Sequence, residues 1–274
     1  MAAVVLITGA TGLIGRYVVA HWALPDLEPV PLSSASDLLS PGAAAAVVRD
    51  VRPAAVLHLA WTASGTPGYR DDARNAAWVT ATHELADACA EAGAWFVGTG
   101  TVVDSAPVDG DTDAYTAAKV RVRRELAPLI DSGGCSWLRP AYVVDPDVGR
   151  PAVVAAALAA RASGEPVHLR TPGSVHDFVH ARDVASAAAV VLGDRLVGEV
   201  PIGSGVARPV TDLVAALGCA WVADPTQVAA VAAAPTGVRT APAPPIHGAE
   251  AADIARLREH GWTPFFTEEM FESD

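Results

Sequence analysis

AAVVLITGATGLIGRYVVAHW, residues 2–22, contains an apolar run, three spaced glycines and a second apolar run. The branched side chains of residues 2–8 predict a fully buried parallel strand that leads into a helix. Gly9 permits a tight turn, Gly12 lets the backbone approach a pyrophosphate, and Gly15 lets the helix pack closely on the strand. Free amides at the start of the helix would then face negative phosphates. Ordinary strand-to-helix turns also contain glycines, but the position directly after the first strand favours a dinucleotide site.

Strand and helix patterns alternate along the next hundred residues. The sequence predicts strands at 27–33, 54–60 and 95–98, and helices at 13–22, 43–51, 73–92 and from 113 onward. This alternation predicts an α/β fold with a doubly wound parallel sheet of the Rossmann type and helices on both faces.

The domain organisation follows from where this regularity weakens. Residues 1–145 are expected to form mainly the dinucleotide-binding Rossmann domain. Residues 146–274 are expected to form mainly a smaller C-terminal substrate-binding lobe, with 175–205 returning to the Rossmann sheet. The Ala- and Pro-rich residues 229–248 are expected to form an irregular loop.

Composition excludes several classes of protein. The 274 residues are 51% hydrophobic and 18% charged, so the chain can form a large buried core. The formal net charge of -12 argues against nucleic-acid and anionic-membrane partners. Cys89, Cys135 and Cys219 lack metal-ligand spacing and are expected to be reduced thiols. No apolar stretch is long enough to span a membrane, and no cleavable signal is recognisable, so we expect a soluble, cytoplasmic protein without a metal site.

The segment DAYTAAK, residues 113–119, begins a predicted helix. Its spacing places Tyr115 and Lys119 on one helical face. A free tyrosine titrates near pH ~10, and a neighbouring ammonium favours the phenolate; a shift of about three units corresponds to about 4 kcal/mol. The phenol can then donate a proton to a carbonyl oxygen as hydride reaches the carbon, or perform the reverse step. The YxxxK spacing is common on surface helices, but together with the glycine turn it predicts a catalytic pair.

A hydroxyl group at the end of the preceding strand would complete this set. Residues 96–102, FVGTGTV, offer Thr99 and Thr101. Because strand ends in parallel sheets face the ligand crevice, Thr99 is favoured, with Thr101 as the alternative. Either hydroxyl could instead bond its own backbone in a turn. The predicted catalytic residues are therefore Thr99, Tyr115 and Lys119.

The end of the second strand bears on the choice of nicotinamide cofactor. In many dinucleotide folds an acidic residue at this position holds the ribose 2′-hydroxyl, whereas this chain has Ser33 and Ser34. These hydroxyls and Arg16, at the start of the first helix, could accept a 2′-phosphate. The pattern favours NADPH over NADH, although Arg16 could equally be a solvated first-turn residue.

These motifs together resemble the extended short-chain dehydrogenase/reductase family, also called the NAD-dependent epimerase/dehydratase family. The resemblance covers nearly the whole chain. It rests on TGATGLIG at 8–15, HLA at 58–60, FVGTGTV at 96–102, YTAAK at 115–119, LRP at 138–140, HDFVH at 176–180 and GSG at 203–205. Asp37 and Leu38 are similar to the family's adenine-contacting pair. The resemblance implies a homodimer.

The resemblance also implies which residues form the two binding sites. The implied cofactor site comprises Gly9, Thr11, Gly12, Leu13, Ile14, Gly15, Arg16, Ser33, Ser34, Asp37, Leu38, Leu59, Ala60, Trp61, Tyr115, Lys119, Pro140, Tyr142 and Val143. The implied substrate site comprises Trp61, Thr62, Thr99, Thr101, Val102, Tyr115, Tyr142, Arg150, His176 and Arg208.

Within this family the chain looks most like nucleotide-sugar 4-ketoreductases, on the basis of HLAW at 58–61, GTPGY at 65–69 and the segment 75–79. A 4,6-dehydratase would carry an Asp-Glu pair after the catalytic threonine, where this chain has Gly100 and Thr101. His176 replaces the arginine that commonly grips the diphosphate, and the candidates to substitute for that arginine are Arg150, Arg182 and Arg208.

We therefore expect an NADPH-dependent ketoreductase of a nucleotide-linked, dTDP-type 4-keto-6-deoxysugar. The alternatives are an epimerase that retains NAD and a reductase of a ketone without a nucleotide. A non-catalytic dinucleotide-binding protein is disfavoured, because binding alone does not require the Thr-Tyr-Lys set.

Overall fold

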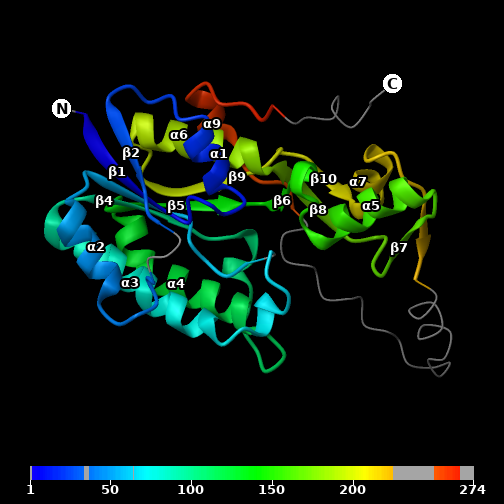
Figure 1. The fold of residues 1–274 in the computed structure, drawn as a ribbon, viewed down its shortest axis with the longest axis horizontal. Helices are drawn as coiled ribbons and strands as arrows, with labels where there is room; N and C mark the ends of the chain where they lie inside the picture. Colours follow the sequence, from blue (N-terminus) through cyan, green and yellow to red (C-terminus); the bar gives the residue numbers. More distant parts are fainter. Residues whose placement is uncertain (1, 34–36, 64, 225–249, 266–274) are drawn as a thin grey trace.

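The computed structural model describes residues 2–33, 37–63, 65–224 and 250–265. Within these residues the chain forms a larger body built on one sheet and a smaller body beside it (Figure 1). The irregular loop expected at 229–248 and the hydroxyl of Ser34 lie outside the described residues. None of the described helices is both long and apolar enough to cross a membrane.

The larger body contains a six-stranded parallel sheet with the strand order β2-β1-β3-β4-β5-β9. Its strands are β1 (Ala3–Thr8), β2 (Leu27–Pro31), β3 (Ala55–His58), β4 (Trp95–Thr99), β5 (Cys135–Pro140) and β9 (Gly198–Ile202). The chain passes from β1 to one neighbour, β2, and then crosses to the other neighbour, β3. Ligands of doubly wound sheets bind at such a reversal, outside the carboxyl ends of the strands. The predicted Rossmann-type α/β fold is confirmed.

Helices cover both faces of this sheet (Figure 1). One face carries α1 (Gly15–Ala20), α6 (Ala181–Asp194) and α9 (Ala255–Glu259), and the other carries α2 (Ala43–Val51), α3 (Arg74–Ala92) and α4 (Ala114–Asp131). Continuous apolar runs such as 55–58 are buried on both faces, which explains why they do not alternate with polar residues.

The smaller body has its own apolar core. Its strands β6 (Tyr142–Val144), β8 (Val175–His180) and β10 (Ala207–Pro209) form a three-stranded sheet, and β7 (Val167–Leu169) pairs with β11 (Trp221–Ala223). Helices α5 (Ala152–Ser163) and α7 (Val210–Ala216) pack on these strands. Three short 3-10 helices complete the described elements: η1 (Tyr69–Asp71), η2 (Val102–Ser105) and η3 (Pro146–Val148).

Two elements differ from the sequence prediction. The sequence predicts that residues 175–205 return to the main sheet. In the structure β8 pairs instead with β6 and β10 in the smaller body. Within this range α6 and β9 do return to the main sheet. The first helix was expected at 13–22, but α1 begins at Gly15 because Gly12 N bonds Gly9 O (2.9 Å) and the intervening residues form turns.

Glycines set the spacing of the first turn, as the sequence predicts. Gly9 has a φ of 69°, and a Cβ at Gly9 would lie 2.6 Å from Ala60 N, where the turn approaches the end of β3. A Cβ at Gly15 would lie 2.2 Å from Gly9 O. The turn, the first helix and the end of β3 can approach this closely only because both positions lack a side chain.

Replacing Gly15 with alanine is expected to lower the free energy of unfolding by about 1–3 kcal/mol, because the new methyl group overlaps backbone atoms that cannot move aside easily. Chemical denaturation measures this loss. Gly110→Ala is the matched control, since a Cβ at that exposed turn meets no atom of the described residues within 4 Å. Equal stability of the two variants would contradict the packing argument.

Candidate functional site

A cavity of about 390 Å³ opens at the carboxyl ends of the parallel strands. Three parts of the chain form its walls: the glycine turn after β1, the segments that follow β3, β4 and β5, and the amino-terminal end of α4. The lining includes Gly9, Gly12, Leu13, Ile14, Gly15, Leu59, Ala60, Trp61, Thr99, Thr101, Val102, Tyr115, Lys119, Pro140, Tyr142, Val143, Arg150 and His176, all of which the sequence analysis singled out. The fold therefore brings most of the predicted residues to one place.

Helix α4 presents Tyr115 and Lys119 to this cavity. The helix is capped by Asp113, whose side chain accepts a hydrogen bond from Thr116 N at 2.8 Å. This cap satisfies a free amide at the start of the helix and fixes where its first turn begins. Tyr115 and Lys119 both line the cavity, as their four-residue spacing predicts.

Lys119 is almost completely buried, with 4% of its surface exposed. Its Nζ donates a hydrogen bond to Thr99 O (2.9 Å) and lies 3.7 Å from the centre of the Trp61 ring. Burial lowers the pKa of Lys119 to about 7, although the negative charge of Asp104 opposes this shift. The ammonium is therefore close to its titration point at neutral pH.

Lys119 is also the only lysine in the chain; the other 18 residues of the lysine-plus-arginine total are arginines. Arginine stays protonated at all ordinary pH values, whereas a lysine changes its charge readily when buried. The use of lysine at this one position fits a site that needs a compact ammonium of adjustable pKa. The single lysine is visible in the sequence alone.

Tyr115 lies among other polar aromatic groups. Its ring packs edge-to-face on that of Tyr69, with the ring centres 5.1 Å apart, and its side chain lies next to that of Thr101. Burial raises the pKa of Tyr115 above its ordinary value, and Tyr69 and Asp104 raise it further. The Thr101 side chain and Arg70 lower it. Arg70, which the motifs do not single out, is a cation that lowers the pKa of this phenol; the lowering role of Lys119 stays a prediction.

The two candidate threonines have different surroundings. Thr99 uses its carbonyl oxygen to hold Lys119, and its buried hydroxyl has no hydrogen-bond partner among the described residues. Thr101, the alternative, is the residue whose hydroxyl contacts Tyr115. Both line the cavity. A buried, unpartnered hydroxyl is costly unless a ligand satisfies it, so Thr99 fits a site that is completed by a bound molecule.

These walls suit a dinucleotide. Gly9 and Gly15 leave no room for side chains, so a ligand at the turn would meet backbone amides. Lys119 and the unpartnered hydroxyl of Thr99 add donors at the far end of the cavity.

Five of the implied cofactor residues do not line the cavity: Thr11, Arg16, Ser33, Asp37 and Leu38. Leu38 is buried in the core against α2 and α3. The carboxylate of Asp37 accepts hydrogen bonds from Leu39 N (3.0 Å) and Ser40 Oγ (2.8 Å), so it caps its own turn.

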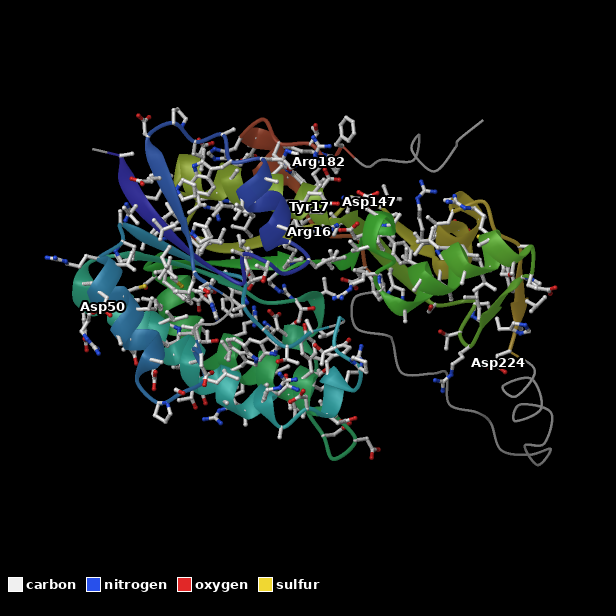
Figure 2. The ribbon with its side chains drawn as sticks, in the orientation of Figure 1. Arg16, Tyr17, Asp50, Asp147, Arg182 and Asp224 are labelled. Carbon is white, nitrogen blue, oxygen red and sulfur yellow. The ribbon has the colours of Figure 1, made fainter. Side chains whose placement is uncertain are left out.

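Arg16 is engaged elsewhere. Its guanidinium forms an ion pair with the completely buried carboxylate of Asp145 and donates to Tyr17 Oη (2.9 Å). Figure 2 shows Arg16, Tyr17 and Asp147 together where the larger and smaller bodies meet. The ion pair connects the end of the glycine turn to the end of β6. Arg16 is one of the three groups that the sequence offers for a 2′-phosphate, and in the structure its guanidinium binds Asp145 instead.

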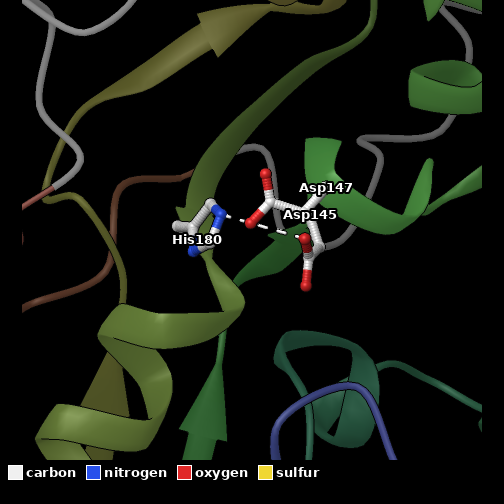
Figure 3. A group of neighbouring side chains, drawn as sticks. All are labelled: Asp145, Asp147 and His180. Carbon is white, nitrogen blue, oxygen red and sulfur yellow. Dashed lines mark ion pairs between the residues drawn. The ribbon is translucent and has the colours of Figure 1, made fainter. Parts of the chain in front are cut away.

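Asp145, Asp147 and His180 form a cluster around this ion pair (Figure 3). His180 Nε2 lies 4.0 Å from Asp145 Oδ1, and its Nδ1 accepts a hydrogen bond from Arg182 N (3.0 Å). Burial raises the pKa of Tyr17, which borders the cluster, to about 12. Because Asp145 already has Arg16 as its counter-ion, we interpret the cluster as an electrostatic contact between the two bodies.

The substrate side of the cavity is largely aromatic. The ring of Tyr142 lies 4.8 Å from that of His176, and burial lowers the pKa of His176. Arg150 reaches across from the smaller body: a Cβ at Gly65 would lie 1.4 Å from its Nη1, so the guanidinium rests against the Gly65 backbone. Two implied substrate residues do not line the cavity. Thr62 accepts a hydrogen bond from Trp78 Nε1 (3.0 Å), and Arg208 pairs with His176 as a β10–β8 neighbour.

Sequence reasoning missed the wall that follows β3. This wall consists of Ala63, Gly65, Thr66, Tyr69 and Arg70, and the further missed lining residues are Gly100, Val103, Ala141 and Pro151. Arg70 Nη1 donates to Asp113 Oδ2 (2.7 Å), which joins this wall to the cap of α4. The available signal was positional, since the segment directly follows the carboxyl end of a buried strand.

His58 lies beneath the site. It is 2% exposed, with Nδ1 2.7 Å from Thr8 Oγ1 and Nε2 3.0 Å from Thr82 Oγ1. Burial and the charge of Lys119 lower its pKa to about 3. It is a neutral core histidine that joins β1, β3 and α3.

Comparison with known proteins identifies the family and agrees with the fold. A family model described as the NAD dependent epimerase/dehydratase family matches residues 5–201. The fold is similar to that of Thermus thermophilus UDP-glucose 4-epimerase in complex with NAD, at 24% identity and a TM-score of 0.69, over 97% of this chain and 96% of that one. It is also similar to Thermotoga maritima UDP-glucose 4-epimerase with UDP-glucose, at 20% identity and a TM-score of 0.72, over 97% and 95% of the two chains.

A third similar structure is dTDP-4-dehydrorhamnose reductase from Bacillus anthracis in complex with NADP. Its identity is 15% and its TM-score 0.67, over 82% of this chain and 84% of that one. No curated protein sequence is detectably similar to this one.

The titration of Lys119 tests the electrostatics of the site directly. Because burial depresses its pKa, Lys119 is expected to titrate near pH 7, instead of near its ordinary value of about 10.4. NMR of protein carrying isotopically labelled lysine follows this single side chain, and its signal should vanish in Lys119→Arg. A midpoint at the ordinary lysine value would refute the buried environment described above.

Proposed function

The chain belongs to the NAD dependent epimerase/dehydratase family, and we propose that within this family it is an NADPH-dependent ketoreductase. The proposed substrate is a nucleotide-linked 4-keto-6-deoxysugar, with dTDP as the first nucleotide to test. One observation carries the proposal: Tyr115, Lys119 and two threonine hydroxyls line the same cavity as the glycine turn.

The glycine turn would hold the pyrophosphate of the dinucleotide through backbone amides. Lys119 would hold the nicotinamide ribose, because its Nζ is already fixed by Thr99 O beside the cavity. When bound, the cofactor supplies the hydride that reduces the ketone carbon.

Tyr115 would supply the proton. Its phenol is positioned at the cavity wall by Tyr69 and Thr101, within reach of a ketone oxygen bound there. As negative charge develops on that oxygen, the phenol protonates it, and Thr99 and Thr101 can donate hydrogen bonds that orient it. Lys119 can support the charge left on Tyr115 after the transfer.

Burial raises the pKa of the Tyr115 phenol, so it carries its proton at neutral pH. In a reduction this phenol would donate its proton, and in the reverse oxidation the phenolate would accept one.

Aromatic and cationic groups support a sugar nucleotide as the substrate. Trp61, Tyr142 and His176 offer flat surfaces for a sugar ring, and Arg150 offers a cation for a phosphate. A ketone without a nucleotide would use the same Tyr115 chemistry and would not need Arg150.

A second candidate is an epimerase that retains NAD. Two observations favour it: the similarity to both UDP-glucose 4-epimerases extends over 97% of the chain, and Arg16 is held by Asp145 rather than presented to a 2′-phosphate. In both candidates we propose that the protein is a cytoplasmic homodimer.

Tyr115→Phe is expected to lower kcat by roughly 10²–10⁴-fold, because it removes the proton donor and keeps the ring. Cofactor affinity should be nearly unchanged, and fluorescence titration with NADPH measures it. Tyr17→Phe is the matched control, since Tyr17 lies outside the cavity and bonds the Asp145 cluster. Full activity of Tyr115→Phe would remove this residue from the mechanism.

Retention of cofactor separates the two candidates. For a ketoreductase we expect exchangeable binding, tighter for NADPH than for NADH, and net oxidation of cofactor with a dTDP-linked 4-keto-6-deoxysugar. The purified protein is extracted for bound nicotinamide before and after dialysis. Tightly retained NAD, with isomerisation of a nucleotide sugar and no net oxidation, would instead establish the epimerase.

A further inference from the structure

A second buried carboxylate lies directly behind the catalytic residues. Asp104, in η2, is 1% exposed. Its Oδ2 accepts hydrogen bonds from Trp137 Nε1 (2.9 Å) and Thr101 N (3.1 Å), and its Oδ1 accepts one from Arg139 Nε (2.9 Å). A Cβ at Gly100 would lie 2.1 Å from Oδ2, so the strand end passes this carboxylate with no room to spare.

The carboxylate is one half of a buried charge network. Arg139 Nη1 also bonds Glu199 Oε1 (2.6 Å), and Arg123 Nη2 bonds Glu199 Oε2 (2.7 Å). Arg123 Nε lies 3.7 Å from Asp104 Oδ1. Two arginines therefore share two carboxylates, with Asp104 at the buried end and Glu199 at the more exposed end.

Thr101 connects this network to the reaction site. Asp104 and Thr101 form a capping box: Asp104 accepts from Thr101 N, and the Thr101 hydroxyl accepts from Asp104 N. The same hydroxyl contacts Tyr115. Asp104 is thus one residue removed from the proposed proton donor and lines no part of the cavity itself.

We propose that Asp104 is a positioning residue for the reaction: its capping box fixes the Thr101 hydroxyl against Tyr115, and its buried negative charge sets the electrostatic environment of Tyr115 and Lys119. The expected effect on kcat rests on the proposed function. The expected effect on the pKa of Lys119 does not depend on which reaction the protein catalyses. Burying a carboxylate costs free energy even when two arginines lie beside it, and a cap on one short turn does not require that cost.

The groups around this carboxylate define the expected shifts. Those that face Asp104 or the two residues it acts on are Arg139, Trp137, Arg123, Glu199, Tyr69, Arg70 and the neutral His58. Burial raises the pKa of Asp104 itself, while Arg139 and Trp137 lower it. In turn the negative charge of Asp104 raises the pKa of both Lys119 and Tyr115. Removing this charge must therefore lower both values.

The first test measures the titration of Lys119 by lysine NMR in Asp104→Asn. The midpoint is expected to fall by roughly one pH unit, because a nearby buried negative charge is lost. Glu199→Gln is the matched control: it removes the other carboxylate of the same network, which does not act on Lys119 directly, and should shift the midpoint less. An unchanged midpoint in Asp104→Asn, or an equal shift in Glu199→Gln, would overturn the electrostatic role.

The second test is kinetic. In Asp104→Asn we expect kcat to fall by roughly 10–100-fold through misplacement of the site, with little change in KM. The alkaline limb of the pH profile for reduction should also move to lower pH, since Tyr115 and Lys119 lose their protons earlier. A uniform loss of rate with no movement of that limb would indicate a merely structural residue.

Two further variants apply if Asp104→Asn does not fold. Thr101→Val removes the hydroxyl on Tyr115 and should lower kcat, while Thr101→Ser keeps the hydroxyl and should restore it; equal activity of the two would refute the positioning route. The lysine titration needs no substrate. A shifted midpoint in a protein without ketoreductase activity would therefore reject the proposed function and retain the inference.

Discussion

The structure depends on the close approach of the glycine turn to the ends of the first and third strands. Gly9 lies against the backbone of Ala60, and Gly15 lies against the carbonyl of Gly9. These contacts bring α1 onto the sheet while leaving the carboxyl ends of the strands open. The turn can close onto β3 and α1 only because side chains are missing at two positions, and the order of the strands brings the residues that line the cavity together.

Burial then sets the chemistry of the groups around this cavity. Burial lowers the pKa of Lys119 and raises the pKa of Tyr115, so it favours the neutral form of both groups. The cause is the same, because moving either charged form out of water costs free energy. Asp104 moderates this effect for Lys119 and strengthens it for Tyr115. One carboxylate that does not enter the cavity thereby changes the pKa of both the proposed proton donor and its neighbouring amine.

The sequence predicts best what is local along the chain. The glycine turn, the Tyr115–Lys119 spacing and the alternation of strands and helices each occupy one short segment, and the fold class is confirmed. Strand position favours Thr99 over Thr101, and this choice stays a prediction. Strand position does not reveal the η2 turn, which Asp104 stabilises and which begins beside Thr101.

Contacts between distant segments account for the remaining differences. Arg16 pairs with a residue 129 positions away, and no local pattern announces that partner. Arg70 approaches Tyr115 only because the segment after β3 folds back onto α4. Strand β8 joins the smaller sheet because β6 and β10 are available to pair with it, which the pattern of residues 175–180 alone does not disclose.

The central claim is that this cavity passes hydride between a nicotinamide and a sugar carbon. The most direct measurement uses NADPH deuterated at the transferable position with a dTDP-linked 4-keto-6-deoxysugar, followed by mass spectrometry and NMR of the product. The account predicts one deuterium per product molecule on the former ketone carbon, with oxidation of an equal amount of cofactor. A product formed without deuterium, or binding of the cofactor with no transfer to any nucleotide sugar, would contradict it.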